Sequence, residues 1–281
     1  MALQLATALP RWLKGHAGYG GPFSADDKLP IIKAIVGADE GAIFDIASAF
    51  YRGAIWEDST RTTLASIDGP VGSLQDELGR YYAEQVTSGA RPTLRTDGAG
   101  HYWLEGVGTH YMSITLNTPI MTQVFIESST RPDYPGSGAH VVLGCRQEDA
   151  SRGGSVQYYG LNCPHVQYRA VDGTTPVRAS SSLTIDDVDT VGMSTIDGVD
   201  AWTQKDNETP SEGELPVAPA DGDNTTWGLF TFFPNSAAPT SPALTMAGRI
   251  YTALISAHLP TDEEKNIVRE WAASRCEDNP L

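Results

Sequence analysis

Glycine and proline interrupt this sequence at short intervals, and that spacing limits the folds open to it. The chain of 281 residues holds 28 glycines and 18 prolines, and the apolar runs between them are mostly short. Such spacing is typical of many strands joined by turns rather than of a set of long helices. We therefore expect a mainly β fold.

Three segments have the clearest strand patterns. In His165–Val171 apolar and polar residues alternate, as in a strand with one buried and one solvated face. Ile120–Glu127 is apolar on both parities for part of its length, which predicts a central strand covered on both faces. Arg249–Leu259 has an unusually complete apolar face that should lie against the core. Further strands are expected at Tyr111–Leu116, His140–Gly144, Val156–Leu161, Val188–Ser194 and Thr226–Phe233.

These strands follow one another without a βαβ rhythm, and turns rich in glycine, aspartate and proline separate them. The order favours an antiparallel two-sheet sandwich. One helix should close it. Thr261 and Glu264 have the spacing of a capping box, and Ile267, Val268, Trp271 and Ala272 form an apolar stripe that can pack on the sandwich.

Two segments have no clear period. Residues 1–40 are interrupted by Pro10, Pro22 and Pro30, yet they are too apolar for a solvated linker, so we predict an N-terminal arm that docks on another subunit. The remainder, residues 41–281, would form the sandwich. Within it, Lys205–Asn224 combines three prolines with several acids and reads as a long exposed loop.

Composition excludes several classes of protein. The formal charge of −16 argues against nucleic acid as a partner, and no apolar run reaches the roughly 18 residues that a membrane span needs. The charges Arg11 and Lys14 follow the first apolar run instead of preceding it, so no export signal is expected. Three cysteines without CxxC spacing indicate free thiols rather than a disulfide framework or a thiolate zinc site: Cys145, Cys163 and Cys276.

Catalytic patterns are weak. Glycoside hydrolysis needs two carboxylates flanking the scissile bond, and acids at i and i+2 on a strand would supply them. The nearest spacings are Glu212-Gly213-Glu214, in the proline-rich loop, and Asp187-Val188-Asp189, beside a turn. Motifs of serine hydrolases, zincins and nucleotide-binding proteins do not occur. We predict that the protein is not an enzyme, with a polysaccharide-cleaving enzyme on the same fold as the alternative.

Two kinds of binding residue can be proposed from the sequence. No cofactor is expected apart from calcium, for which the candidate ligands, also ordinary turn residues, are Asp186, Asp187, Asp189, Asp221 and Asp223. A glycan would stack on exposed aromatic rings beside polar groups, and the candidates are Tyr134, Tyr158, Tyr159, Trp202, Trp227 and Asn224. Tyr158 and Tyr159 are neighbours, so only one of them can point inward from a strand.

Two stretches at the start and end of the expected sandwich resemble a known family. The first includes Gly41–Asp45, Trp56–Ser59 and Ala90–Arg95, and continues through the aromatic strand Asp97–Glu105. The second joins Gly248-Arg249-Ile250-Tyr251 to Leu259-Pro260-Thr261-Asp262. Together they are similar to phage and prophage structural proteins with a concanavalin A-like (laminin-G-like) jelly roll. After the aromatic strand, that family has Asp-Gly-Val-Asp-Asp, whereas this chain has Glu105-Gly106-Val107-Gly108-Thr109 and lacks both acids of the turn.

The resemblance implies a virion protein, such as a tail fibre, head fibre or decoration subunit, assembled in the bacterial cytoplasm. Its jelly roll would either bind a host surface glycan or decorate the particle. The implied partners are other virion proteins, contacted through residues 1–40, further copies of the chain, and a host polysaccharide. A free lectin outside any particle is a third hypothesis.

Overall fold

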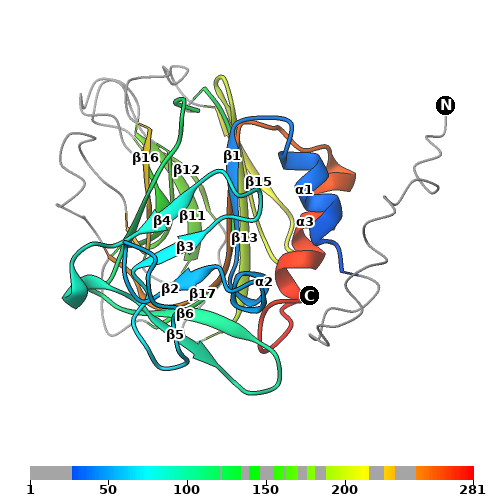
Figure 1. Cartoon of the computed structure of the whole chain (residues 1–281). Helices are drawn as coiled ribbons and strands as arrows, with labels where there is room; N and C mark the ends of the chain where they lie inside the picture. Colours follow the sequence, from blue (N-terminus) through cyan, green and yellow to red (C-terminus); the bar gives the residue numbers. More distant parts are fainter. Residues whose placement is uncertain are drawn as a thin grey trace.

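The computed structural model describes residues 27–120, 122–133, 139–145, 155–160, 163–169, 176–180, 188–214, 225–231 and 245–281. Two antiparallel sheets form a sandwich, and two helices lie side by side on one flank of it (Figure 1). Sheet A has the strand order β15-β14-β13-β8-β17-β6-β5, with β1 also paired to β17. Sheet B has the order β12-β11-β10-β9-β16-β7-β4-β3-β2. The predicted mainly β, two-sheet antiparallel sandwich is confirmed.

The strands of sheet A are β1 (Gly41–Asp45), β5 (Thr93–Thr96), β6 (Tyr102–Val107), β8 (Gln123–Pro132), β13 (Thr190–Asp197), β14 (Asp200–Lys205), β15 (Ser211–Glu214) and β17 (Ala247–Ser256). The strands of sheet B are β2 (Ile55–Trp56), β3 (Ser73–Gln75), β4 (Tyr82–Glu84), β7 (Met112–Thr115), β9 (Ala139–Gly144), β10 (Ser155–Gly160), β11 (Cys163–Arg169), β12 (Pro176–Ser180) and β16 (Thr226–Leu229). The helical segments are α1 (Leu29–Val36), α2 (Ile46–Tyr51), the 3₁₀ turn η2 (Ser88–Ala90) and α3 (Asp262–Ala273).

Sheet A is covered on both faces, as the apolar pattern of Ile120–Glu127 predicts for its central strand. Val124 and Ile126 of β8 point into the core between the sheets, whereas Phe125 packs with the two helices on the opposite face. Strand β17 beside it is buried at almost every position. The sequence predicts one apolar face for this strand. Its second face is also buried, because α1 and α3 cover it.

Helix α3 begins as its sequence predicts. The Thr261 hydroxyl accepts from the Glu264 backbone amide, and the Glu264 carboxylate accepts from the Thr261 amide at 2.8 Å, which completes the capping box. Three acids lie in the first turn, where they face the positive end of the helix dipole. Val268 and Trp271 from the predicted stripe are buried against sheet A.

Part of the predicted docking arm packs on its own chain. Helix α1 lies within residues 1–40, and its Ile32 and Val36 are fully buried in the cluster that includes α3. Just before the helix, Asp27 accepts from Arg275 at 2.8 Å. The prediction that this stretch docks elsewhere is therefore wrong for residues 27–40, because Ile32 and Val36 pack against α3 and β1 of the same chain. Residues 1–26 lie outside the described residues.

The predicted loop Lys205–Asn224 contains a strand. Residues Ser211–Glu214 form β15, which pairs with β14 so that Glu212 lies opposite Trp202 and Glu214 opposite Asp200. The acids and prolines hid this strand from the sequence pattern, since charged side chains and prolines are common on edge strands and leave no apolar alternation to recognise. Residues 215–224 lie outside the described part of the chain.

Cys145 and Cys276 are free, buried thiols. Burial raises the pKa of both groups, so both remain protonated. Cys163 is on β11, where its side chain lies outside the described atoms. None of the helices in the described ranges combines the length and apolar composition needed to cross a bilayer.

Candidate functional site

Most of the binding residues proposed from the sequence cannot be placed. Tyr134 and Asn224 lie outside the described residues, and so do Asp186, Asp187, Asp221 and Asp223. Tyr158 and Tyr159 lie on β10, and their backbones pair with Val141 and His140 of β9. Their side chains are outside the described atoms, so which of them faces solvent stays a prediction.

Trp227 lies in the core, not on a binding surface. It is 1% exposed and packs between the two sheets. The prediction that Trp227 stacks on a glycan is therefore wrong, because neither face of its indole ring is open to a ligand.

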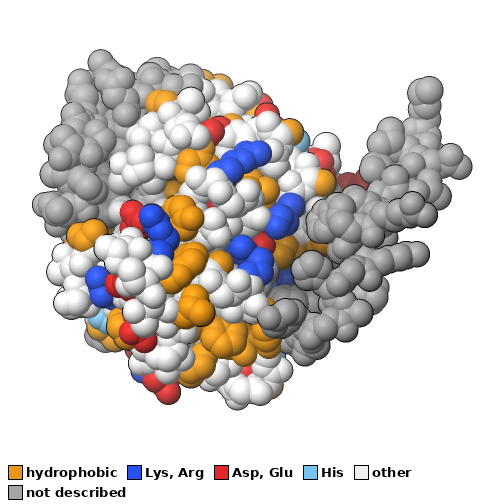
Figure 2. Space-filling view, viewed as in Figure 1, with side chains coloured by type: hydrophobic (Ala, Val, Ile, Leu, Met, Phe, Trp, Pro, Cys, Tyr) orange, Lys and Arg blue, Asp and Glu red, His pale blue; other side chains and the backbone are white. Residues whose placement is uncertain are grey.

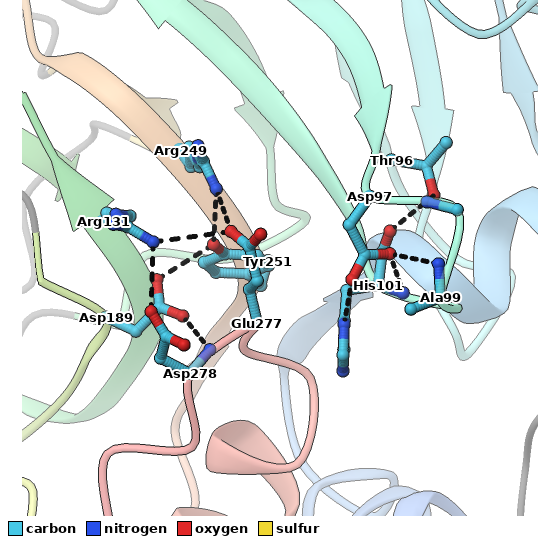
Figure 3. A network of polar contacts seen from close by, with 11 residues as sticks. Thr96, Asp97, Ala99, His101, Arg131, Asp189, Arg249, Tyr251, Glu277 and Asp278 are labelled. Atoms are coloured by element: carbon cyan, nitrogen blue, oxygen red, sulfur yellow. Dashed lines mark hydrogen bonds and ion pairs between the residues drawn. The ribbon is translucent and has the colours of Figure 1, made fainter.

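Asp189 holds the C-terminal segment against sheet A. It is 1% exposed, and its carboxylate accepts from the Tyr251 hydroxyl at 2.9 Å and from the Asp278 backbone amide at 2.7 Å (Figure 3). Burial raises the pKa of this carboxyl. Arg131 and Arg249 contact Glu277 beside it. Both Asp189 oxygens therefore serve a structural contact. In the described ranges, no group of three or more His, Cys, Asp or Glu side chains is placed to hold a metal ion.

Trp202 lines an acidic hollow at the edge of sheet A. The hollow has a volume of about 460 Å³, and its lining includes Trp202 and the four carboxylates Asp197, Asp200, Glu212 and Glu214. The indole ring is half-buried, and the Lys265 ammonium lies 4.2 Å from its centroid. Of the proposed stacking residues, Trp202 is the one whose described side chain lines a hollow.

A second hollow lies on the outer face of sheet B and has a different lining. Its volume is about 370 Å³, and it is lined by Arg61, Arg80, Tyr81, Tyr82, Glu84, Ser113, Thr115 and Asn117. Strand alternation explains the lining, because residues i and i+2 of a strand share one face. Ala83 and Ile114 point inward and are fully buried, whereas their neighbours on β4 and β7 point out. Basic and hydrophobic side chains gather over this part of the molecule in Figure 2.

The loop that follows β2 folds over this face and positions Arg61. One carboxylate oxygen of Asp58 accepts hydrogen bonds from the side chain of Thr60 and the amide of Thr62. The other accepts from the side chain of Thr62 and, at 3.1 Å, from the Thr63 amide. These bonds, the Thr60 hydroxyl first, hold the pKa of Asp58 well below its usual range. Within the loop, Arg61 has a φ of 59°. A non-glycine residue in this left-handed region is uncommon and persists where its surroundings fix it.

Arg61 covers the ring of Tyr82 and pairs with Glu84. Its guanidinium carbon lies 4.1 Å from the ring centroid, and one terminal nitrogen donates to the Glu84 carboxylate at 2.7 Å. The Tyr82 hydroxyl accepts from Gln75 at 3.1 Å, and the Trp56 ring lies 6.2 Å from the Tyr82 ring. The half-buried Tyr82 ring and the guanidinium stacked on it therefore form one wall of the hollow, and Trp56 lies behind them, outside the lining.

The other part of the lining is held by hydrogen bonds to residues 37–40, which directly precede β1. Arg80 donates to the backbone carbonyls of Asp39, at 2.9 Å, and Gly37. The Tyr81 hydroxyl donates to Glu40 and accepts from the Asn117 amide at 2.6 Å. Burial, together with the bond to Glu40, raises the pKa of Tyr81 to about 12, so the phenol stays neutral at physiological pH. These contacts keep the lining in a fixed arrangement.

Sequence reasoning missed the residues of this hollow. The strands that build it are short, β4 being Tyr82–Glu84 and β7 Met112–Thr115, so alternation is visible over too few positions to single out a face. The one available signal was Asp58 followed by threonines at positions 60, 62 and 63, a pattern of a side-chain-capped loop.

No protein-family model and no curated protein matches the chain. Among solved structures, it is similar to the CBM40 of Ruminococcus gnavus IT-sialidase bound to alpha2,3 sialyllactose, with 12% identity and a TM-score of 0.42 over 52% of this chain and 80% of that chain. It is also similar to the botulinum neurotoxin serotype D binding domain, with 12% identity and a TM-score of 0.49 over 73% of this chain and 52% of that chain. The likeness concerns the arrangement of strands over part of each chain.

Proposed function

We propose that this chain is a glycan-binding appendage protein of a phage or phage-like particle, acting by binding and not by catalysis. The observation that carries the binding role is the hollow on sheet B, where aromatic rings, hydroxyl groups and an amide line one surface. Short polar side chains fix the orientation of sugar hydroxyls, and the Tyr82 ring, with Arg61 stacked on it, adds contact area beside them. The lining belongs to hydrogen-bonded strands and a capped loop, so little ordering cost opposes binding.

The virion role is supported by the family-like segments. The first of them contains β1 and the second contains most of β17, and these strands pair from Gly41 opposite Ser256 to Asp45 opposite Thr252. Two segments far apart in the sequence thus meet in one sheet, as expected if they belong to a single inherited fold. On this proposal residues 1–26 dock on other virion proteins, copies of the chain associate, and the protein is assembled in the bacterial cytoplasm and resides in the virion.

Binding is tested with fluorescently labelled protein on an array of bacterial surface polysaccharides. The wild type should bind at least one glycan, and Tyr82→Ala should weaken that binding while Trp202→Ala, at the other hollow, should not. An array on which the wild type binds nothing contradicts the glycan-binding role. Cross-linking of residues 1–26 in purified particles tests the virion role separately, and a protein absent from particles contradicts it.

A polysaccharide-cleaving enzyme is the second candidate, and one observation favours it. Glu212 and Glu214 lie on strand β15 and not in a loop, and both line the acidic hollow beside Trp202. Residues i and i+2 of a strand are about 7 Å apart along the chain, within the range of carboxylate separations that glycosidases use. Release of reducing ends from polysaccharide, abolished by Glu212→Gln, would support the enzyme over the binding protein.

A further inference from the structure

The lining of the sheet B hollow is positively charged in a chain that is strongly acidic overall. Arg61 and Arg80 supply two positive charges and Glu84 one negative charge, so the lining has a net charge of +1 (2 − 1), whereas the whole chain has −16. Among the described residues, the acid that pairs with Arg61 is Glu84, and the hydrogen-bond acceptors of Arg80 are backbone carbonyls. The charge of Arg80 is therefore not neutralised by its partners.

Arg61 is held with part of its hydrogen-bonding capacity in use. Its guanidinium stacks on Tyr82 and donates one hydrogen bond to Glu84. A guanidinium has five N–H donors in one plane, and stacking on an aromatic ring leaves that planar edge able to meet a carboxylate in a bidentate pair. The side chain is 37% exposed, so a ligand can reach it.

The loop around Arg61 is held in one conformation before any ligand binds. The left-handed backbone at Arg61 is fixed by the hydrogen bonds that Asp58 accepts from Thr62 and Thr63. Strain of this kind, held by surrounding contacts, is found preferentially where a side chain must be presented in one orientation. A fixed guanidinium favours a ligand whose charge lies at one defined position.

Resting on the proposed glycan-binding function, we infer that the sheet B hollow takes an acidic saccharide, a sugar whose carboxylate pairs with Arg61. Glu84 holds Arg61 over Tyr82 in the free protein and competes with the ligand carboxylate for it. Arg80, whose hydrogen bonds go to backbone carbonyls, adds a second positive charge, and Ser113, Thr115 and Asn117 supply neutral partners for sugar hydroxyls. The hollow at Trp202 is lined by four carboxylates and would repel the same ligand.

The test compares acidic oligosaccharides with their own carboxyl-reduced derivatives, which keep every linkage and lose only the charge. Oligogalacturonate, hyaluronan and alginate oligomers and oligosialic acid are the probes, and calorimetry measures the affinity. At least one acidic oligomer should bind the wild type about tenfold or more tightly than its reduced form. The advantage should shrink between about 0.05 M and about 0.5 M NaCl, since salt screens the pairing of exposed charges.

Three variants separate the roles of the charges. Arg61→Gln should remove the preference for the acidic form, and Arg61→Lys should retain only part of it, because an ammonium lacks the planar fork. Glu84→Gln should bind the acidic oligomer more tightly than the wild type does, since the competing carboxylate is gone. Arg95→Gln is the matched control, as Arg95 has 38% exposure and pairs with Asp68 and Glu105 away from the hollow; it should bind as the wild type does.

Equal binding of the acidic and reduced oligomers, or weaker binding by Glu84→Gln, would overturn the inference and leave glycan binding intact. Tighter competition by glucose 6-phosphate than by glucuronate would overturn the carboxylate assignment. If neutral glycans bind and none of the acidic probes does, the inference alone fails. If no saccharide of either kind binds, the proposed function fails with it.

Discussion

The two outer faces of the sandwich have opposite surroundings. On sheet A, Phe125 and Leu254 lie under α1 and α3 and are fully or almost fully buried. On sheet B, Tyr82 and Glu84 alternate with the buried Ala83, and the outer face remains open at a hollow. The two faces therefore serve different purposes. A strand with apolar side chains on both faces needs a covering layer, and burying it adds stability. A strand with alternating side chains leaves one face open for binding.

The largest expected effect comes from substituting a buried acid on the covered face of sheet A. Glu127 is fully buried, and one of its oxygens accepts from Thr252 at 2.9 Å while the other makes no hydrogen bond. Burial raises its pKa from 4.5 to about 8. Below pH 4.5 the carboxyl is protonated in both the folded and unfolded states. Between there and about pH 8 only the unfolded state loses the proton, so the free energy of unfolding falls as pH rises.

At 1.36 kcal/mol for each unit of pKa, that loss is on the order of 5 kcal/mol across this pH range. Glu127→Gln should remove this part of the pH dependence and be more stable than the wild type at alkaline pH. Urea unfolding at a series of pH values measures it. The neighbouring Asp45 is ion-paired with Arg275 at 2.8 Å and serves as a background common to both proteins. A variant that loses stability with pH as steeply as the wild type would contradict the assignment.

Removing the helix cover should cost somewhat less. Trp271 of α3 is 1% exposed and packs on sheet A, so Trp271→Ala should lower the free energy of unfolding by about 3–5 kcal/mol. The indole nitrogen makes no hydrogen bond, so Trp271→Phe should cost clearly less than the alanine variant. Denaturant unfolding followed by circular dichroism measures both. Equal losses in the two variants would mean that ring size is not what stabilises this contact.

The sequence predicts the covered face better than the open one. The run from Ile120 to Glu127 and the stripe on the closing helix are long enough for a period to be recognised. The structure buries residues 124–127 of the run, and Val268, Trp271 and Ala272 of the stripe. The predicted docking arm extended to residue 40 because apolar residues at positions 29–36 indicate that the segment packs against another surface, without indicating which surface. That partner is α3, more than 200 residues later in the sequence. Such a distant contact leaves no trace in local periodicity.

The open hollow could not be predicted from composition or spacing. Its lining comes from two loops, one holding Arg61 and one holding Arg80 and Tyr81, from the short strands β4 and β7, and from Asn117 after β7. The pairing of β4 with β7 brings them together. Two of the aromatic candidates, Trp202 and Trp227, illustrate the difficulty. Both are tryptophans beside polar residues, yet Trp227 points into the core and Trp202 lines a hollow, and only the sheet register separates them.

A smaller effect distinguishes binding from stability on the open face. Tyr82 is half-buried and supports the Arg61 guanidinium. Tyr82→Ala should weaken glycan affinity about tenfold, equivalent to about 1.4 kcal/mol, because the ring contact and the positioning of Arg61 are lost together. The matched variant at the acidic hollow, Trp202→Ala, should leave affinity for the same glycan unchanged. The reverse result would move the binding site to the edge of sheet A.

The smallest expected effect is that of the loop that presents Arg61. Asp58 does not line the hollow itself. Its backbone carbonyl accepts from the Arg61 amide at 3.3 Å, and its carboxylate accepts hydrogen bonds from Thr60, Thr62 and Thr63. Asp58→Ala should therefore free the loop and reduce glycan affinity only a few-fold, through the added cost of ordering Arg61 on binding. Asp58→Asn keeps one acceptor oxygen, enough for one of the two threonine amides, and should restore part of the affinity. Calorimetry with one glycan compares the two, and the entropy of binding should account for the loss. An alanine variant with wild-type affinity would show that the left-handed backbone at Arg61 is maintained by the rest of the loop, in which case the open face is as rigidly built as the covered one.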